Sequence, residues 1–320
     1  MLLLTGATGL VGSALLPRLL AEGQTVRCLV RDPRRLGPQR VRVQIALGDL
    51  TDPPSFRNAM RGVETVVHLA ASTRDQSRGS IEELAAIATW RMVEAAQRAG
   101  VERFVFFSTL GASTHHRARL FRAKALAEKA VRESDMHSIV IAPSLVYEPG
   151  DRWLGLIERL SLLPVVSVSG RGRAVCQPIW AEDVAGCVVA ALGGAGAAGG
   201  SEEEEEEEEE EAAAAADESE EAGGEATHER YELAGPQTMT YNEVVNAVLR
   251  SLDRERPLLP IPTPIVSRTL HVVERAMHAS TPITWDEAEL LEANMVAKGG
   301  CADAEALGVT PQPMSAVLGR

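Results

Sequence analysis

The chain begins with a short apolar run that leads directly into a glycine-rich turn, Thr5–Gly12, and then into an amphipathic segment. This order constrains the fold, because the three glycines of such a turn have separate tasks. The first permits a tight turn, the second lets the backbone approach a pyrophosphate, and the third lets helix and strand pack closely, while the helix N-terminus attracts the anion. We therefore predict that a dinucleotide is contacted by Gly6, Ala7, Thr8, Gly9, Leu10, Val11 and Gly12.

Short apolar runs alternate with amphipathic helical segments from the start of the chain to about Val146. This alternation predicts an α/β fold with a doubly wound parallel sheet and helices on both of its faces. We assign residues 1–150 to this core. Strands are expected at Leu2–Leu4, Val26–Val30, Val43–Leu47, Val66–Leu69, Phe104–Phe107 and Ile139–Ile141, and helices at Leu10–Ala21, Ile81–Ala99 and Ala118–Arg132.

The pattern loosens beyond Val146, where residues 151–320 are expected to form a smaller C-terminal α/β lobe on the substrate side, interleaved with the core. Residues 193–226 include ten consecutive glutamates and cannot bury enough apolar surface to order themselves. We predict a disordered insertion there, with a fraying Glu/Ala helix as the alternative. Beyond four closely spaced prolines, amphipathic helices are expected at Ile265–Met277 and Trp285–Val296.

The charge of the chain is concentrated in one segment. The formal net charge is −13, but residues 201–225 hold fifteen acidic side chains and no basic one, and without them the charge is +2. We expect no nucleic-acid partner. No apolar run approaches the roughly 18 residues of a membrane span, and the apolar start is too short for a signal peptide, so a cytoplasmic location is expected. No metal or disulfide pattern is formed by the four cysteines, Cys28, Cys176, Cys187 and Cys301.

Arginines follow the second predicted strand. Arg31 stands where an acidic residue would bind the ribose 2′-hydroxyl of NAD, and Arg35 follows in the same turn. A guanidinium there would pair with the 2′-phosphate of NADP(H). We therefore predict NADP(H), with Arg31 and Arg35 as ligands. Because Asp32 is adjacent, a register shift of one residue would favour NAD(H), and arginines of a solvated turn are a further alternative.

Two more turns fall at the same edge of the predicted sheet. Asp49 and Leu50 follow the third strand, where a carboxylate can accept a hydrogen bond from the adenine amino group. Ala70 and Ala71 follow the fourth strand, where small side chains let a cofactor pass closely. We predict these four residues as cofactor contacts, with ordinary loop structure as the alternative for each turn.

A series of short segments spans nearly the whole chain. In order, they are TGATGLVG, LVRDP, GDL, HLAA, FVFFSTLGA, FRAKALAEKAVRES, APSLVYEPGD, PIWAEDVA and YELAGPQTMTYNEVV. They resemble the extended and atypical branches of the short-chain dehydrogenase/reductase superfamily, which include epimerase/dehydratase-like proteins. The closing segments PLLPIPTPI, TPITWDEAELLEANMV and LGVTPQPM are similar to bacterial relatives of the nucleotide-binding accessory subunit of respiratory complex I, with NmrA-like sensors and isoflavone-reductase-like enzymes as neighbours. The resemblance implies a Rossmann fold, a nicotinamide dinucleotide, and a possible protein partner or membrane-associated complex.

The catalytic pattern that this resemblance implies is incomplete. The superfamily uses a tyrosine four residues before a lysine, with a serine or threonine nearby. Lys124 matches the lysine and would reach the nicotinamide ribose, but Leu120 stands at the tyrosine position. Thr109 falls where the substrate-orienting hydroxyl is expected, with a local hydrogen bond as the alternative. The segment beside the nicotinamide is matched by Pro143, Ser144 and Val146.

Other side chains could supply the missing proton. His115 and His116 lie between Thr109 and Lys124, and Tyr147 follows the sixth strand, although these are also typical surface and packing residues. Three functions stay open. The first is a non-catalytic NADP(H)-binding sensor or complex subunit, which accounts for most of the residues. The second is an NADP(H)-dependent oxidoreductase that uses Lys124 with Thr109 or a loop histidine, and the third is an interaction scaffold with an empty nucleotide site.

Overall fold

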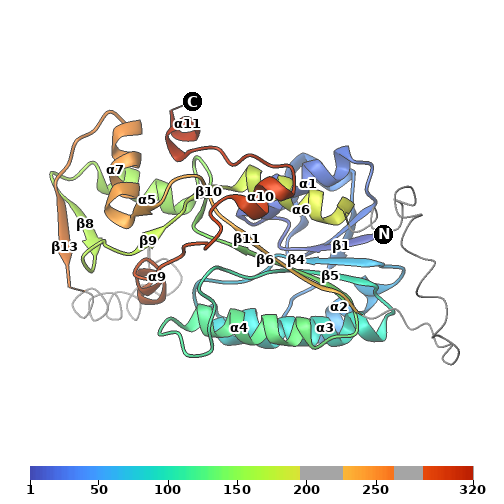
Figure 1. Cartoon of the computed structure of the whole chain (residues 1–320). Helices are drawn as coiled ribbons and strands as arrows, with labels where there is room; N and C mark the ends of the chain where they lie inside the picture. The colour runs from blue at the N-terminus through green and yellow to red at the C-terminus, as the bar shows by residue number, and fades with distance from the viewer. Residues whose placement is uncertain (195–225, 263–283, 320) are drawn as a thin grey trace, which may run out of the picture.

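A computed structural model describes residues 1–194, 226–262 and 284–319 of the chain. Its centre is a sheet of seven strands in the order β11-β6-β5-β4-β1-β2-β3, and every neighbouring pair is parallel (Figure 1). The strands are β1 (Leu2–Thr5), β2 (Val26–Val30), β3 (Gln44–Leu47), β4 (Thr65–His68), β5 (Arg103–Phe107), β6 (His137–Pro143) and β11 (His228–Leu233).

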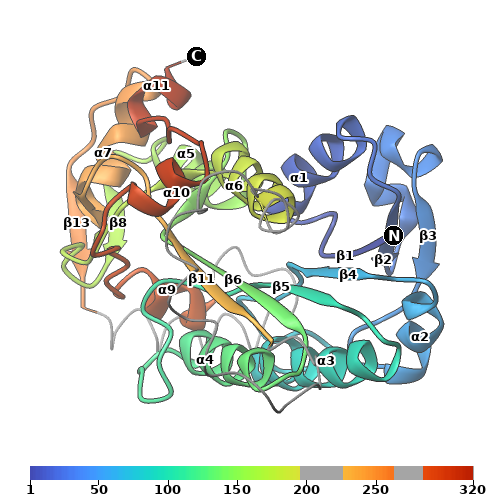
Figure 2. The ribbon, with the colours of Figure 1, turned by 45° about the vertical axis from the view of Figure 1, so that its right-hand side comes forward.

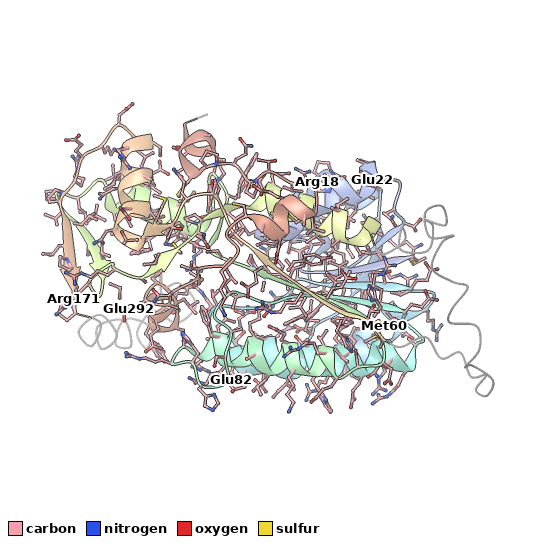
Figure 3. All side chains as sticks on the ribbon, in the orientation of Figure 1. Arg18, Glu22, Met60, Glu82, Arg171 and Glu292 are labelled. Atoms are coloured by element: carbon pink, nitrogen blue, oxygen red, sulfur yellow. The ribbon has the colours of Figure 1, made fainter. Side chains whose placement is uncertain are left out.

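Helices cover both faces of this sheet, so the predicted α/β class is confirmed (Figure 2). One face is covered by α1 (Leu10–Ala21) and α6 (Ala181–Gly194), which are joined by the ion pair of Arg18 with Glu182 at 2.8 Å; Figure 3 shows Arg18 beside α6. The other face is covered by α3 (Ala88–Arg98) and α4 (Arg119–Arg132). Shorter elements on that half of the chain are η1 (Pro33–Val41), α2 (Pro53–Arg57), η2 (Asn58–Met60) and the π-helical η3 (Glu83–Ile87).

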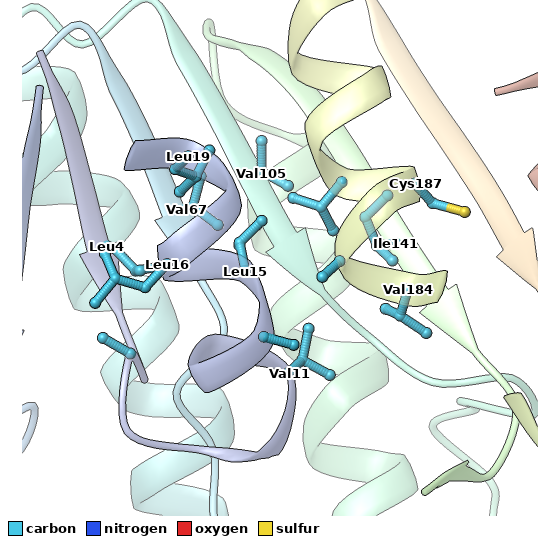
Figure 4. Packing of buried hydrophobic residues seen from close by; sticks show 14 of the residues in the cluster. Leu4, Val11, Leu15, Leu16, Leu19, Val67, Val105, Ile141, Val184 and Cys187 are labelled. Carbon is cyan, nitrogen blue, oxygen red and sulfur yellow. The ribbon is translucent and has the colours of Figure 1, made fainter. Parts of the chain in front are cut away.

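The inner strands β1, β4, β5 and β6 are largely apolar because both of their faces are buried, whereas the edge strands β3 and β11 are partly exposed. Leu4 and Val105 pack with Leu15 beneath α1 and α6 (Figure 4), whereas Leu3 and Phe104 belong to the cluster beneath α3 and α4. Successive residues of one strand therefore serve two different cores.

The seventh strand comes from the second half of the chain. Strand β11 pairs with β6 from His228 opposite Ser138 to Leu233 opposite Pro143. The division into a core of residues 1–150 and a lobe of residues 151–320 stays a prediction, because β11 and α6 lie on the central sheet although they follow residue 150.

The rest of the second half packs around a core of its own, at the end of the molecule opposite to β3 (Figure 2). Its strands form three pairs: β7 (Val146–Tyr147) with β10 (Ile179–Trp180), β9 (Val175–Cys176) with β12 (Met239–Thr240), and β8 (Val166–Ser169) with β13 (Leu258–Ile261). The helices are α5 (Arg152–Leu160), α7 (Tyr241–Ser251), α9 (Trp285–Leu290), α10 (Ala302–Ala306) and α11 (Met314–Leu318).

One predicted helix is wrong in its length. The helix expected over Trp285–Val296 ends at Leu290, because Asn294 Oδ1 accepts a hydrogen bond from the Val175 amide and Met295 forms a parallel bridge with Cys176. The predicted helix at residues 265–277 lies outside the described residues. Of the insertion predicted at residues 193–226, only residues 193, 194 and 226 are described. The first two form the end of α6, which continues to Gly194. All four cysteines are free thiols, and no helix within the described ranges is long and apolar enough to cross a bilayer.

Candidate functional site

The glycine turn after β1 has the geometry that its sequence predicts. Gly6 adopts a φ of +74°, and a Cβ there would lie 2.7 Å from the Ala70 amide nitrogen. A Cβ at Gly12 would lie 2.1 Å from the Gly6 carbonyl oxygen, so helix α1 could not pack this closely with any side chain at that position. Gly9 is different, since a Cβ there would meet only the Gly6 oxygen, at 3.2 Å. Its open side leaves the helix N-terminus accessible, which fits a pyrophosphate.

A cavity of about 260 Å³ lies at the carboxyl ends of β1, β2, β3 and β4. The strand order reverses between β1 and β4, the place where open α/β sheets bind their ligands. The cavity brings together most of the predicted cofactor contacts: Gly6, Ala7, Thr8, Gly9, Arg31, Arg35, Asp49, Leu50, Ala70 and Ala71.

The turn after β2 brings two arginines to this cavity, whereas the carboxylate of Asp32 lies outside it. Arg31 and Arg35 line the cavity, and Arg31 Nη1 donates to Gln76 Oε1 at 3.0 Å. Asp32 does not line it, because its carboxylate accepts from the Arg34 amide at 3.0 Å and caps η1. This turn therefore brings guanidinium groups to the cavity, whereas the Asp32 carboxylate is used in capping η1.

Asp49 holds its carboxylate at the same cavity. Asp49 Oδ1 accepts from the Thr51 amide at 3.0 Å and from the Thr51 hydroxyl at 2.9 Å, and Oδ2 pairs with Arg78 at 3.1 Å. Burial alone would raise the pKa of Asp49, but these hydrogen bonds outweigh it and the pKa is lowered. The side chain is thus an ionised acceptor, as contact with an adenine amino group requires.

A second cavity, of about 440 Å³, continues the first along the N-terminus of α1. The two share Gly6, Gly9 and the loop after β4, so they form one cleft along the edge of the sheet. The remaining predicted contacts of the glycine turn, Leu10, Val11 and Gly12, line this part together with Val146.

Lys124 lies beneath this cleft but lines neither cavity. Its side chain is buried, its ammonium donates to the Phe107 carbonyl oxygen, and Nζ sits 4.9 Å above the Phe106 ring. Burial lowers the pKa of Lys124 to about 7, although the negative charge of Glu128 raises it in part. Leu120, at the tyrosine position, packs against a small apolar cluster of α4 and η3.

Three further predicted residues are occupied by backbone contacts. The Thr109 hydroxyl donates to the carbonyl oxygens of Leu110 at 3.3 Å and Pro143 at 3.5 Å. Ser144 Oγ donates to the Met295 oxygen at 2.7 Å and accepts from the Gln177 amide at 2.9 Å. Thr109, Pro143 and Ser144 line neither cavity. In the structure Thr109 joins the ends of β5 and β6, and Ser144 ties the end of β6 to the lobe.

The alternative proton donors also lie away from the cleft. His115 is exposed, and His116 stacks on Phe121 with ring centroids 4.4 Å apart while its Nδ1 accepts from the Ala118 amide. Tyr147 is fully buried, and its hydroxyl has no hydrogen-bond partner among the described residues. Burial raises the pKa of Tyr147, so its hydroxyl stays protonated.

His68, at the end of β4, is a site residue that the sequence did not predict. Its ring is fully buried, and burial lowers its pKa to about 3, so the ring is neutral. Thr89 Oγ1 donates to the Ala85 oxygen at 2.7 Å and must therefore accept from His68 Nε2, at 3.0 Å. Nδ1 is then the acceptor for the Thr5 hydroxyl, at 2.8 Å. This chain of hydrogen bonds fixes the start of the glycine turn to the helix that follows η3.

No cluster of side chains suited to a metal ion occurs within the described ranges.

The chain is similar to known proteins over both the cleft and the fold. A family model for NAD(P)H-binding proteins matches residues 6–170. Ceramide reductase of Caulobacter vibrioides is 31% identical over 189 residues, which are 58% of this chain and 59% of that protein. A mitochondrial NADH dehydrogenase [ubiquinone] 1 alpha subcomplex subunit 9, from Arabidopsis thaliana, is 26% identical over 81% of this chain and 60% of its own length. The matches thus span about three fifths of each relative.

Among solved structures, a nucleoside-diphosphate-sugar epimerase from Staphylococcus aureus superposes with a TM-score of 0.73. The superposition covers 100% of this chain and 99% of that one at 16% identity, so it speaks for the fold alone.

Proposed function

Because the chain belongs to the NAD(P)H-binding family, as an atypical member of the short-chain dehydrogenase/reductase superfamily, we propose that it holds NADP(H) without tyrosine-dependent catalysis. The observation that carries this proposal is the site beneath the cleft. Leu120 replaces the proton donor, and the Lys124 ammonium is turned to the Phe107 carbonyl oxygen. A role as a sensor or as a subunit of a larger complex follows, and the similarity to the complex I subunit supports the latter.

In this proposal each part of the nucleotide has its own contacts in the cleft. The glycine turn would hold the pyrophosphate, Arg31 and Arg35 the 2′-phosphate, and Asp49 the adenine amino group. Ala70 and Ala71 would let the ribose pass over β4. When bound, the reduced nicotinamide would supply a hydride, and the accompanying proton would have to reach the substrate from Lys124, which lies beneath the cleft and lines neither cavity.

The experiment is a search for turnover by protein that has been shown to bind NADPH. We expect no oxidation of NADPH above background with a panel of aldehydes and ketones. Sustained oxidation that is lost in Lys124→Met would contradict the proposal.

A second candidate is an NADP(H)-dependent reductase that uses Lys124. It is favoured by the pKa of Lys124, which burial lowers to about 7, a value suited to proton transfer, and by the similarity to a ceramide reductase. Hydride would pass to a carbonyl carbon while the Lys124 ammonium gives its proton to the oxygen. Lys124→Met should then abolish turnover and leave weakened nucleotide binding.

A further inference from the structure

Large aliphatic side chains are exposed together at the far end of the lobe. Leu162 is 69% exposed, Leu163 53%, Val165 37% and Leu259 53%. We call these four residues the lobe tip. They belong to the turn after α5 and to the β8–β13 pair, which lies at the opposite end of the molecule from β3 (Figure 2).

The fold of the lobe does not require leucines at these positions. The buried stripe of α5 runs through Leu154 and Ile157 to Ser161, at helical spacing. Leu162 and Leu163 follow that stripe in the same turn of chain, and they point outward because they are off its register. Single exposed leucines are ordinary, whereas adjacent ones beside further exposed aliphatic residues indicate an interaction surface.

The strand register makes the lobe tip continuous. Leu259 pairs with Ser167, and both are exposed, whereas the neighbouring Val166 is buried. Paired residues share one face of a sheet, so Leu259 and Ser167 lie on the same exposed face. Val165 directly precedes β8, two residues before Ser167, and is exposed as well.

Basic side chains lie next to the exposed leucines. A cavity of about 410 Å³ is lined by Arg250, Arg254 and Arg256, together with Glu243, Glu255, Asn246 and Leu249. Arg254 Nη1 donates to Ser161 Oγ at 2.5 Å, and Arg256 Nε donates to the Leu163 oxygen at 3.2 Å. The cavity therefore adjoins the turn that carries the leucines.

The charges of these arginines are not neutralised by direct ion pairs. None of the three forms an ion pair with a carboxylate among the described residues. The Glu243 carboxylate is already used, because it accepts from the amide and the hydroxyl of Thr240 in the capping box of α7. The cavity is thus lined by three guanidiniums and two carboxylates, those of Glu243 and Glu255, which leaves one positive charge in excess.

We propose that the lobe tip docks on an anionic lipid surface. The leucines enter the boundary between headgroups and acyl chains, and lipid phosphates sit at the arginine-lined cavity. Four partly exposed side chains offer at most a few hundred Å² of apolar area, less than the roughly 800 Å² that each partner buries in a stable protein interface. Shallow insertion into a membrane needs no larger area, and this proposal does not depend on nucleotide binding.

The test is sedimentation of the full chain with vesicles of phosphatidylcholine alone and of phosphatidylcholine mixed with phosphatidylglycerol. We expect binding to the mixed vesicles that weakens with salt. The double change Leu162→Ser/Leu163→Ser should weaken it at least about tenfold, and Arg250→Gln about fivefold. Arg250 is chosen because it is exposed and lines the cavity, whereas Arg254 and Arg256 are hydrogen-bonded to the turn after α5.

The matched control is Val41→Ser/Leu47→Ser, which removes two aliphatic side chains in and beside β3, at the other end of the molecule. They are 82% and 65% exposed, at least as much as the leucines taken in order, and binding should be unchanged. Vesicle binding that survives the leucine change overturns the proposal. An absence of vesicle binding by the wild-type chain overturns it too. If the leucine change then converts a dimer to a monomer, the surface is occupied by a second copy of the chain. A large loss of thermal stability in the leucine variant overturns it as well, because the leucines would then be covered by the chain's own residues.

Discussion

The two halves of the cleft differ in what their side chains are free to do. One half is the cavity that we propose for the adenosine and the pyrophosphate, and we call it the adenosine half. There Gly9 leaves the N-terminus of α1 accessible, and Arg31 and Arg35 line the cavity. Beneath the part that we propose for the nicotinamide, which we call the nicotinamide half, the Lys124 ammonium and the Thr109 hydroxyl line neither cavity and are bonded to main-chain oxygens. A dinucleotide can be held by the first half alone, since affinity comes from phosphate and adenine contacts, while chemistry needs a proton donor in the second. The difference separates holding the nucleotide from reacting with it.

The sharpest way to break this comparison is to close the adenosine half. Gly9 has a φ of −85°, which any residue can adopt, and apart from the Gly6 oxygen at 3.2 Å its Cβ position meets open space. In Gly9→Val the branched side chain would occupy the path of the pyrophosphate, so we expect at least about a hundredfold loss of NADPH affinity, close to 3 kcal/mol, with little change in thermal stability. Gly155→Val, where a Cβ also meets open space, is the control and should bind normally.

Changes at the nicotinamide half should act on stability through pH. An unfolded lysine keeps its proton up to about its ordinary pKa of 10.5, whereas burial lowers the pKa of Lys124 to about 7 in the folded chain. Through this group the folded state binds fewer protons between these values, so the contribution of Lys124 to stability rises with pH, by a few kcal/mol at most. Burial raises the pKa values of the Cys28, Cys176 and Cys187 thiols, which lowers stability as the pH approaches their ordinary value, so the rise is expected in the lower part of this window, between about pH 7 and 8. Urea unfolding along a pH series should show this rise in the wild type and in the exposed control Lys129→Met, and lose it in Lys124→Met. A slope retained in Lys124→Met would mean that another group titrates.

The specificity of the adenosine half is tested by Arg31→Ala. Loss of a charge-assisted pair with the 2′-phosphate should weaken NADPH binding about ten- to a hundredfold and NADH binding far less. Arg34→Ala is the control, because Arg34 lies in the same turn but does not line the cavity. Equal losses for the two nucleotides would show that Arg31 does not meet the 2′-phosphate.

The smallest effect is expected from His68, which connects the turn to the helix behind it. In His68→Asn the amide oxygen can still accept from Thr5, whereas in His68→Gln the amide nitrogen can still donate to Thr89. We expect the glutamine variant to bind NADPH about fivefold more weakly than the asparagine variant, since one hydrogen bond to the turn is worth about 1 kcal/mol. If the two variants bind NADPH with the same affinity, the hydrogen bond from Thr5 to His68 does not contribute to binding, and His68 acts only in packing.

Local patterns predicted much of the fold, and contacts between distant segments account for what they missed. The alternation of apolar strands with amphipathic helices predicted six strands of the central sheet. Burial on both faces leaves a strong apolar signal in the inner strands, and the exposed edge strand β3 keeps enough apolar residues to be recognised. Strand β11 is an edge strand with charged, half-exposed residues such as Glu229 and Arg230, and it lacks that signal. The helix from Trp285 was predicted too long because its end depends on Asn294 meeting Val175.

The same distinction holds for the site. The glycine turn, Arg31 and Asp49 each act within a few residues of their own strand, so sequence placed them at the cleft. The role of His68 depends on Thr5, 63 residues away, and no local pattern reports it. The orientation of Lys124 likewise depends on Phe107 in a neighbouring strand.

The central claim, that the cleft holds NADP(H), is tested most directly by calorimetric titration of the purified chain with NADPH and, separately, with NADH, after any copurified nucleotide has been removed. The account predicts that NADPH binds at least about ten times more tightly than NADH. A folded chain that binds neither nucleotide would contradict the account and leave the interaction scaffold as the better description.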